Sequence, residues 1–176
     1  GLGGIGLEMA KRAKGFDMKV LYHSRTRKSE TEKEYGLKYA SFNRVLTESD
    51  FISIHVPLTP ETTRFIGEKQ LKMMKSSAIL VNLSRGPVID TGALCKALTK
   101  GWIAGAGLDV FDPEPIPAGH PVLGLDNVVV LPHIGSASNR SRREMHLLAA
   151  RNLLAGLNGE RLEECANPEV YEFLGI

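Results

Sequence analysis

Three side chains with the chemistry to handle a carbonyl compound stand where predicted strands end. Arg85 lies in the run Asn-Leu-Ser-Arg-Gly, Glu114 lies between two prolines, and His133 lies in the run Pro-His-Ile-Gly-Ser. The planar fork of arginine can bind a carboxylate and polarise a keto oxygen, and histidine can give a proton to an alkoxide near neutral pH. A glutamate bound to the other ring nitrogen would orient the imidazole and favour its protonated form. Reduction of a 2-keto acid needs these groups, with the hydride supplied by a nicotinamide.

Each of the three residues also has an ordinary interpretation. An arginine after a strand is commonly a surface ion-pair partner, a glutamate between prolines is commonly just exposed, and a histidine after proline is commonly structural. Spacing along the chain does not show that the three meet. The other histidines compete as proton donors from less suggestive contexts: His23, His55, His120 and His146.

A glycine-rich turn opens the chain with the spacing G-x-G-x-x-G at Gly1, Gly3 and Gly6, with Gly4 and Ile5 between them. This spacing turns a strand tightly into a helix and lets the backbone approach a pyrophosphate at the positive end of that helix. Helical spacing of apolar residues follows at positions 5, 9 and 13, and a glycine at position 15 stops the run. No strand precedes the turn in this sequence, so we expect the chain to be a fragment.

A basic segment follows the next predicted strand, where the type of dinucleotide is decided. It consists of Ser24, Arg25, Thr26, Arg27 and Lys28. An NAD site carries an acid at this position for the ribose hydroxyls, whereas a hydroxyl and several cations can hold a 2′-phosphate by charge-assisted hydrogen bonds. The segment predicts NADP(H) as the cofactor. The alternative is a solvated loop of ordinary charge.

Alternation of strands and helices predicts an α/β fold with a doubly wound parallel sheet of the Rossmann type. Residues 1–136 are predicted to form a dinucleotide-binding domain truncated at its N-terminus, and residues 137–176 a long helix and a C-terminal segment without a strong period. We expect strands at 19–23, 51–56, 78–83, 106–110 and 128–131. We expect helices after the glycine turn as far as Gly15, around 45–46, at 68–74, from Asp90 or Thr91 to Gly101, and at 137–157.

Composition narrows the function further. The 176 residues carry a formal net charge of +2, with basic and acidic residues interspersed, which does not favour a nucleic-acid partner. Cys95 and Cys165 lie far apart without metal-type spacing, so we expect no metal site and a reducing, cytoplasmic compartment. The sequence has no apolar run long enough to span a bilayer, so no membrane partner is expected.

The ordered motifs at 1–6, 82–86, 107–115 and 132–136 together resemble the NAD(P)-dependent D-2-hydroxyacid dehydrogenases, and within them the glyoxylate/hydroxypyruvate reductases. The resemblance implies that Arg85 binds the keto acid and that Glu114 pairs with His133, the proton donor. It implies a homodimer and a second, substrate domain formed mainly by residues before the glycine turn. It also assigns cofactor contacts: Gly3, Gly4 and Ile5 to the pyrophosphate; Arg25, Thr26, Arg27 and Lys28 to the 2′-phosphate; Pro57, Leu83, Asp109 and Gly135 to the ribose and nicotinamide.

Two other functions remain open at this point. The family resembles cofactor-sensing corepressors that act through protein partners, and it includes NAD-dependent enzymes such as phosphoglycerate and formate dehydrogenases. Ser24 and Arg25 argue against both, because these proteins look NAD-selective. The sequence does not decide between glyoxylate and hydroxypyruvate as the substrate.

Overall fold

The computed structural model describes residues 1–175, which divide into two compact units. The first unit spans Gly1–His133, and the second begins at Ile134. The first unit carries the glycine turn and the three candidate catalytic side chains, so most of the candidate site lies within it.

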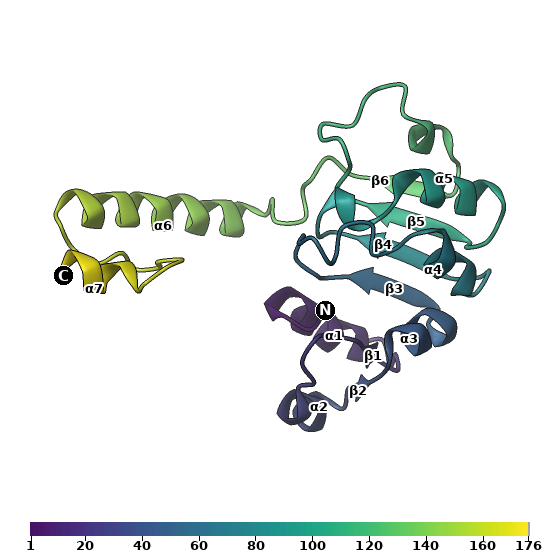
Figure 1. Ribbon diagram of the computed structural model, residues 1–176, viewed down its shortest axis with the longest axis horizontal. Helices are drawn as coiled ribbons and strands as arrows, with labels where there is room; N and C mark the ends of the chain where they lie inside the picture. The colour runs from purple at the N-terminus through teal and green to yellow at the C-terminus, as the bar shows by residue number, and fades with distance from the viewer. Residues whose placement is uncertain (176) are drawn as a thin grey trace. The chain divides into compact units, whose positions relative to one another are not determined.

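A parallel four-stranded sheet organises the first unit, in the order β3-β4-β5-β6 (Figure 1). The register pairs Ile54 with Asn82 and Asn82 with Leu108. The chain therefore leaves β3, β4 and β5 at one edge of the sheet, which is where ligands bind in open α/β sheets. The strands are shorter than expected but lie where the sequence predicts them: β3 (Phe51–Ile54), β4 (Ile79–Asn82), β5 (Gly105–Leu108) and β6 (Val128–Val130).

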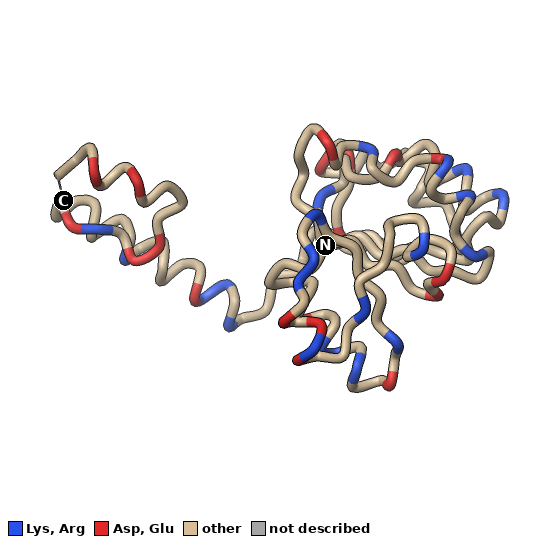
Figure 2. Tube along the Cα trace, turned by 60° about the horizontal axis from the view of Figure 1, so that its bottom comes forward, with Lys and Arg blue, Asp and Glu red and all other residues tan. Residues whose placement is uncertain are grey.

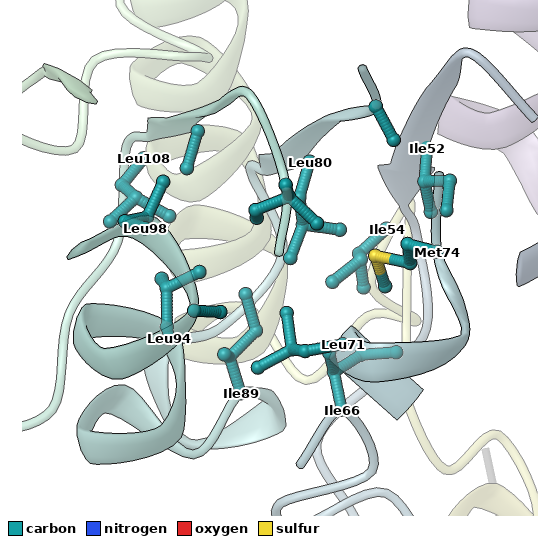
Figure 3. Close-up of a cluster of buried hydrophobic side chains, with 14 of the residues drawn as sticks. Ile52, Ile54, Ile66, Leu71, Met74, Leu80, Ile89, Leu94, Leu98 and Leu108 are labelled. Atoms are coloured by element: carbon teal, nitrogen blue, oxygen red, sulfur yellow. The ribbon is translucent and has the colours of Figure 1, made fainter. Parts of the chain in front are cut away.

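Helices α3 (Phe42–Glu48), α4 (Glu68–Met73) and α5 (Thr91–Thr99) pack their apolar side chains on this sheet. Figure 3 shows the resulting cluster, in which side chains from the helices and from the strands converge. The side chain of Asp90 accepts a hydrogen bond from the backbone N–H of Ala93, which makes Asp90 the cap of α5. Leu71, Leu80 and Leu94 are at most 1% exposed.

A second, two-stranded parallel sheet is formed by β1 (Leu21–Tyr22) and β2 (Lys38–Tyr39). Helices α1 (Gly4–Lys14) and α2 (Ser29–Tyr35) belong to the same part of the chain. Its small core is made of Leu2, Ala10, Tyr22 and Leu37. Neither α2 nor β2 was predicted from the sequence, because both are short and mostly polar.

Helix α1 buries a different face from the one that the apolar spacing suggests. Ile5 is 74% exposed and Met9 is 41% exposed, whereas Gly6 and Ala10 are buried. A side chain at Gly6 would overlap the carbonyl of Gly1. The helix therefore approaches the glycine turn closely on its small residues, and the larger apolar side chains point elsewhere.

The glycine turn lies between the ends of β1 and β3. The amino nitrogen of Gly1 donates to the carbonyl of His23 at 2.7 Å, and a Cβ on Gly1 would lie 2.6 Å from the carbonyl oxygen of His55. His23 follows β1 and His55 follows β3, and within residues 1–175 these two strands are not paired with each other. Gly1 therefore contacts the residues that follow both of these strands.

The second unit contains α6 (Asn139–Leu157), capped by Ser138, and the short helix α7 (Val170–Leu174). Helix α6 confirms the predicted helix, whereas α7 was not predicted, because five residues are too few to show a period. None of the described helices is both long and apolar enough to cross a membrane. Figure 2 shows basic and acidic residues interspersed along both units.

Candidate active site

A histidine and a carboxylate meet at the end of the sheet. His133 Nδ1 lies 2.5 Å from Glu114 Oε1, and both side chains are partly exposed. His133 comes shortly after β6, and Glu114 lies in the long loop that connects β5 to β6. The structure thus brings together two of the three predicted catalytic side chains.

The backbone of His133 adopts an unusual conformation. Its φ of 54° lies in the left-handed region, which is uncommon for residues other than glycine. Such conformations cost free energy and cluster at functional sites. Because Nδ1 is bound to the carboxylate, Nε2 is the ring nitrogen that can face a substrate.

A cavity of about 220 Å³ adjoins the histidine–carboxylate pair. Apolar side chains make up most of its wall, and the pair supplies the polar groups. An apolar wall lowers the local dielectric constant, which strengthens the electrostatic interactions of groups beside it. The lining residues are Phe111, Glu114, Pro115, Ile116, Val130, Leu131, Pro132 and His133.

Arg85 lies on a turn that is wound around the side chain of Asn82, the last residue of β4. Asn82 is 1% exposed, and its Oδ1 accepts hydrogen bonds from the backbone N–H of Ser84 at 3.0 Å and from the Ser84 hydroxyl at 2.9 Å. Its Nδ2 donates to the carbonyl of Arg85 at 3.0 Å. Asn82 therefore fixes the backbone that carries Arg85, a role that the sequence analysis did not assign. A lone amide ending an apolar strand was the available signal.

The turn of Arg85 packs directly on the loop of Glu114. A Cβ on Gly86 would overlap the carbonyl of Phe111, so only glycine fits there without displacing backbone. The backbone N–H of Phe111 in turn faces Glu114 Oε2 at 3.5 Å. Arg85 thus stands on a segment in backbone contact with the segment that supplies the carboxylate.

The glycine turn suits a pyrophosphate. Gly3 precedes the first turn of α1, and neither Gly3 nor Gly4 would have any atom within 4 Å of an added Cβ. Open space above glycine backbone at a helix N-terminus is what a phosphate group needs to approach the N–H groups. Ile5, the third predicted pyrophosphate contact, is also exposed.

The basic segment after β1, residues 24–28, is called the basic loop below. The hydroxyl of Ser24 donates to the carbonyl of Thr26 at 2.7 Å, and residues 25–28 are exposed. Arg27 is already engaged, because its guanidinium forms two hydrogen bonds with the carboxylate of Glu32. The cations of the loop therefore have different surroundings in the structure, a difference that the sequence does not show.

Three of the remaining predicted cofactor contacts follow neighbouring strands at one edge of the sheet. Pro57 comes after β3, Leu83 directly after β4, and Asp109 directly after β5. Asp109 is 2% exposed, whereas Leu83 is 38% exposed. Gly135 belongs to the second unit. Within residues 1–175 no three His, Cys, Asp or Glu side chains are grouped as metal ligands.

Comparison with known proteins gives a consistent picture. The model of the D-isomer specific 2-hydroxyacid dehydrogenase NAD-binding domain matches residues 1–135. Glyoxylate reductase of Thermococcus litoralis is 56% identical over 170 residues, which are 97% of this chain and 51% of the relative. Glyoxylate/hydroxypyruvate reductase B of Pectobacterium carotovorum is 51% identical over 171 residues, 97% of this chain and 53% of the relative.

A solved structure agrees with the sequence relatives. The crystal structure of the TT0316 protein from Thermus thermophilus superposes with a TM-score of 0.87 at 47% identity, covering 93% of this chain and 51% of that one. The chain spans about half the length of the curated relatives that it matches. With a parallel sheet, a glycine turn and a family model covering most of its length, the chain belongs to the D-isomer specific 2-hydroxyacid dehydrogenases.

Proposed function

We propose that the protein containing this chain reduces a small 2-keto acid, glyoxylate or hydroxypyruvate, to the D-2-hydroxy acid with NADPH. The observation that carries the proposal is the hydrogen bond between His133 and Glu114 beside an apolar cavity. The arginine that could bind a carboxylate stands on a turn packed against the same loop. Relatives named glyoxylate reductase support the choice of substrate.

Each side chain has a distinct task in this reaction. The guanidinium of Arg85 binds the substrate carboxylate and draws electron density toward the keto oxygen. His133 gives its Nε2 proton to that oxygen as negative charge develops there, and Glu114 holds the ring and balances its positive charge. The nicotinamide of the cofactor supplies the hydride.

The choice of NADPH is supported by the end of β1, where Ser24 stands in place of the acid of an NAD site. Arg25 follows on the exposed loop and can form charge-assisted hydrogen bonds to a 2′-phosphate. The reaction is tested by following oxidation of NADPH and NADH in the full-length protein with each keto acid. The proposal fails if neither keto acid is reduced, or if NADH is the preferred donor.

A cofactor-switching variant tests the assignment of the loop. We expect Ser24→Asp combined with Arg25→Ala, in the full-length protein, to weaken NADPH binding by at least about tenfold, because two charge-assisted contacts are lost. NADH binding should be equal or improved, because the new carboxylate can accept both ribose hydroxyls. Cofactor titration monitored by fluorescence measures both dissociation constants. Equal weakening of both cofactors would reduce the basic loop to a solvated surface segment.

We extend the proposal to a homodimer in the cytoplasm. Both Cys95 and Cys165 are free thiols, which suits a reducing compartment. The molar mass of the full-length protein, measured by light scattering, tests the dimer. A monomeric mass at working concentration would contradict it.

A further inference from the structure

Glu32, on helix α2, is hydrogen-bonded to Arg27 of the basic loop and to Tyr22 of the strand before it. Its Oε1 lies 2.8 Å from Arg27 Nε, and its Oε2 lies 2.9 Å from Arg27 Nη2. The hydroxyl of Tyr22, at the end of β1, donates to Oε1 at 2.7 Å and accepts a hydrogen bond from the backbone N–H of Lys28 at 2.8 Å. One carboxylate thus joins the strand before the loop, the loop itself and the helix after it.

The environment of Glu32 suits a permanent ion pair. Its side chain is only 12% exposed, although Arg27 is 62% exposed. Hydrogen bonds from Arg27 and then from Tyr22 lower the pKa of Glu32 to about 2. The carboxylate is therefore ionised throughout the neutral range, and Arg27 keeps its partner under working conditions.

Glu32 already occupies part of the hydrogen-bonding capacity of Arg27. The edge formed by Nε and Nη2 is one of the two guanidinium edges that offer a parallel pair of donors, and both of its nitrogens donate to this carboxylate. The guanidinium also lies over the ring of Tyr39, with 5.8 Å between its central carbon and the ring centroid. Arg25 precedes Arg27 on the exposed loop, outside this contact.

We propose that Arg27 and Glu32 are positioning residues for cofactor selection: their ion pair fixes the basic loop so that Ser24 and Arg25 can meet the 2′-phosphate, and Arg27 is not itself a phosphate ligand. This inference rests on the proposed use of NADPH. The family resemblance implied that all the cations of the loop surround the phosphate. The present inference removes Arg27 from that set of ligands.

A double-mutant cycle in the full-length protein tests the inference. The variants are Arg27→Gln, Glu32→Gln and the pair together, and the probes are 2′,5′-ADP and 5′-AMP, titrated by calorimetry. We expect each single variant to weaken 2′,5′-ADP by about fivefold, with no further loss in the double variant, because both changes break the same ion pair. Binding of 5′-AMP should not change. A general structural defect would weaken both probes.

Two other outcomes of the cycle overturn the inference. If Arg27→Gln still weakens 2′,5′-ADP in the Glu32→Gln background, Arg27 contacts the phosphate directly. If Glu32→Gln strengthens 2′,5′-ADP, the carboxylate competes with the phosphate for Arg27. Arg25→Gln is the matched reference, because a direct ligand held in place by the ion pair should lose affinity in the wild-type background and lose less of it in the Glu32→Gln background.

Tryptic cleavage separates this inference from the choice of cofactor. If wild type binds 2′,5′-ADP no better than 5′-AMP, the proposed use of NADPH fails, and loop fixation is judged by the rate of cleavage after Arg25. Glu32→Gln and Tyr22→Phe should each raise that rate by about fivefold, because a loosened loop reaches the protease more often. Arg44→Gln, which breaks the exposed Arg44–Glu48 pair on α3, is the control and should leave it unchanged. Equal rates in all variants overturn the positioning role.

Discussion

The imidazole of His133 is set by two local constraints, a left-handed backbone and the bond from Nδ1 to Glu114. If its Nε2 supplies the proton, His133→Gln should lower kcat by roughly 10²–10⁴ in the full-length protein, because an amide cannot donate a proton to the alkoxide. The dissociation constant of NADPH should stay nearly the same. Steady-state kinetics and cofactor titration measure the two quantities. A variant that keeps most of its turnover would remove His133 from the mechanism.

Arg85 differs from a simple positive charge because its planar fork can hold a carboxylate and a keto oxygen together. Arg85→Lys keeps the charge and loses the fork, so we expect a higher KM for the keto acid and a lower kcat at the same time. Kinetics with glyoxylate at saturating NADPH measure both. Unchanged constants would make Arg85 a structural residue.

The roles of some single residues could be predicted from the sequence, whereas the roles of others could not. Arg85, Glu114 and His133 could be chosen because their side chains match a reaction and because they follow predicted strands. The role of Asn82 could not be seen, because it consists of hydrogen bonds to the next turn. The pairing of Arg27 depends on α2, an element that the sequence did not reveal.

At the scale of elements, Gly86 joins the turn after β4 to the loop after β5. Gly86→Ala should lower the free energy of unfolding by about 2 kcal/mol or more, because the added methyl overlaps the carbonyl of Phe111 and the backbone must move. It should also impair turnover, since Arg85 lies next to it. Urea denaturation and kinetics measure the two effects. Gly124→Ala is the control, because an added Cβ there would have nothing within 4 Å.

Helices α4 and α5 are tied together by Glu68. Its carboxylate binds Lys72 at 2.5 Å and Lys96 at 2.7 Å, and these two contacts lower its pKa from 4.5 to about 2. A lowered pKa in the folded state means that the ionised carboxylate stabilises the fold above the unfolded pKa and stops doing so as pH falls toward 2. Glu68→Gln should therefore lower stability at neutral pH.

The difference in stability between Glu68→Gln and wild type should shrink between about pH 4.5 and about pH 2, where both carry an uncharged group at this position. Urea denaturation over this pH range measures it. The kinetics with glyoxylate should not change, because the ion pairs of Glu68 are with Lys72 and Lys96 and with none of the three candidate catalytic side chains. A difference that is constant with pH would show that the ion pairs do not stabilise the two helices.

The elements themselves were predictable to different degrees. Strand β4 was found because a continuous apolar run is typical of a buried parallel strand, and β3, β5 and β6 were found from the alternation of strands and helices. The buried face of α1 could not be read from its apolar spacing, because close packing against the glycine turn favours Gly6 and Ala10 over larger residues. Helix α2 is almost entirely polar and α7 has only five residues, so neither shows an apolar period.

At the scale of the whole molecule, the first unit holds two parallel sheets with the glycine turn between them. The family assignment and the parallel sheets agree that this is a dinucleotide-binding fold. Composition and strand–helix alternation were enough to predict that class. They could not show which loops touch, because contacts between loops depend on register and backbone shape.

The contact of Gly86 with Phe111 has a consequence for how this site can change. Arg85 and Glu114 stand on segments whose backbones touch, so these two stretches of main chain cannot shift independently of each other. A substitution that displaces one segment therefore displaces the other. If the protein acts as proposed, such a change alters the placement of the arginine and of the carboxylate together.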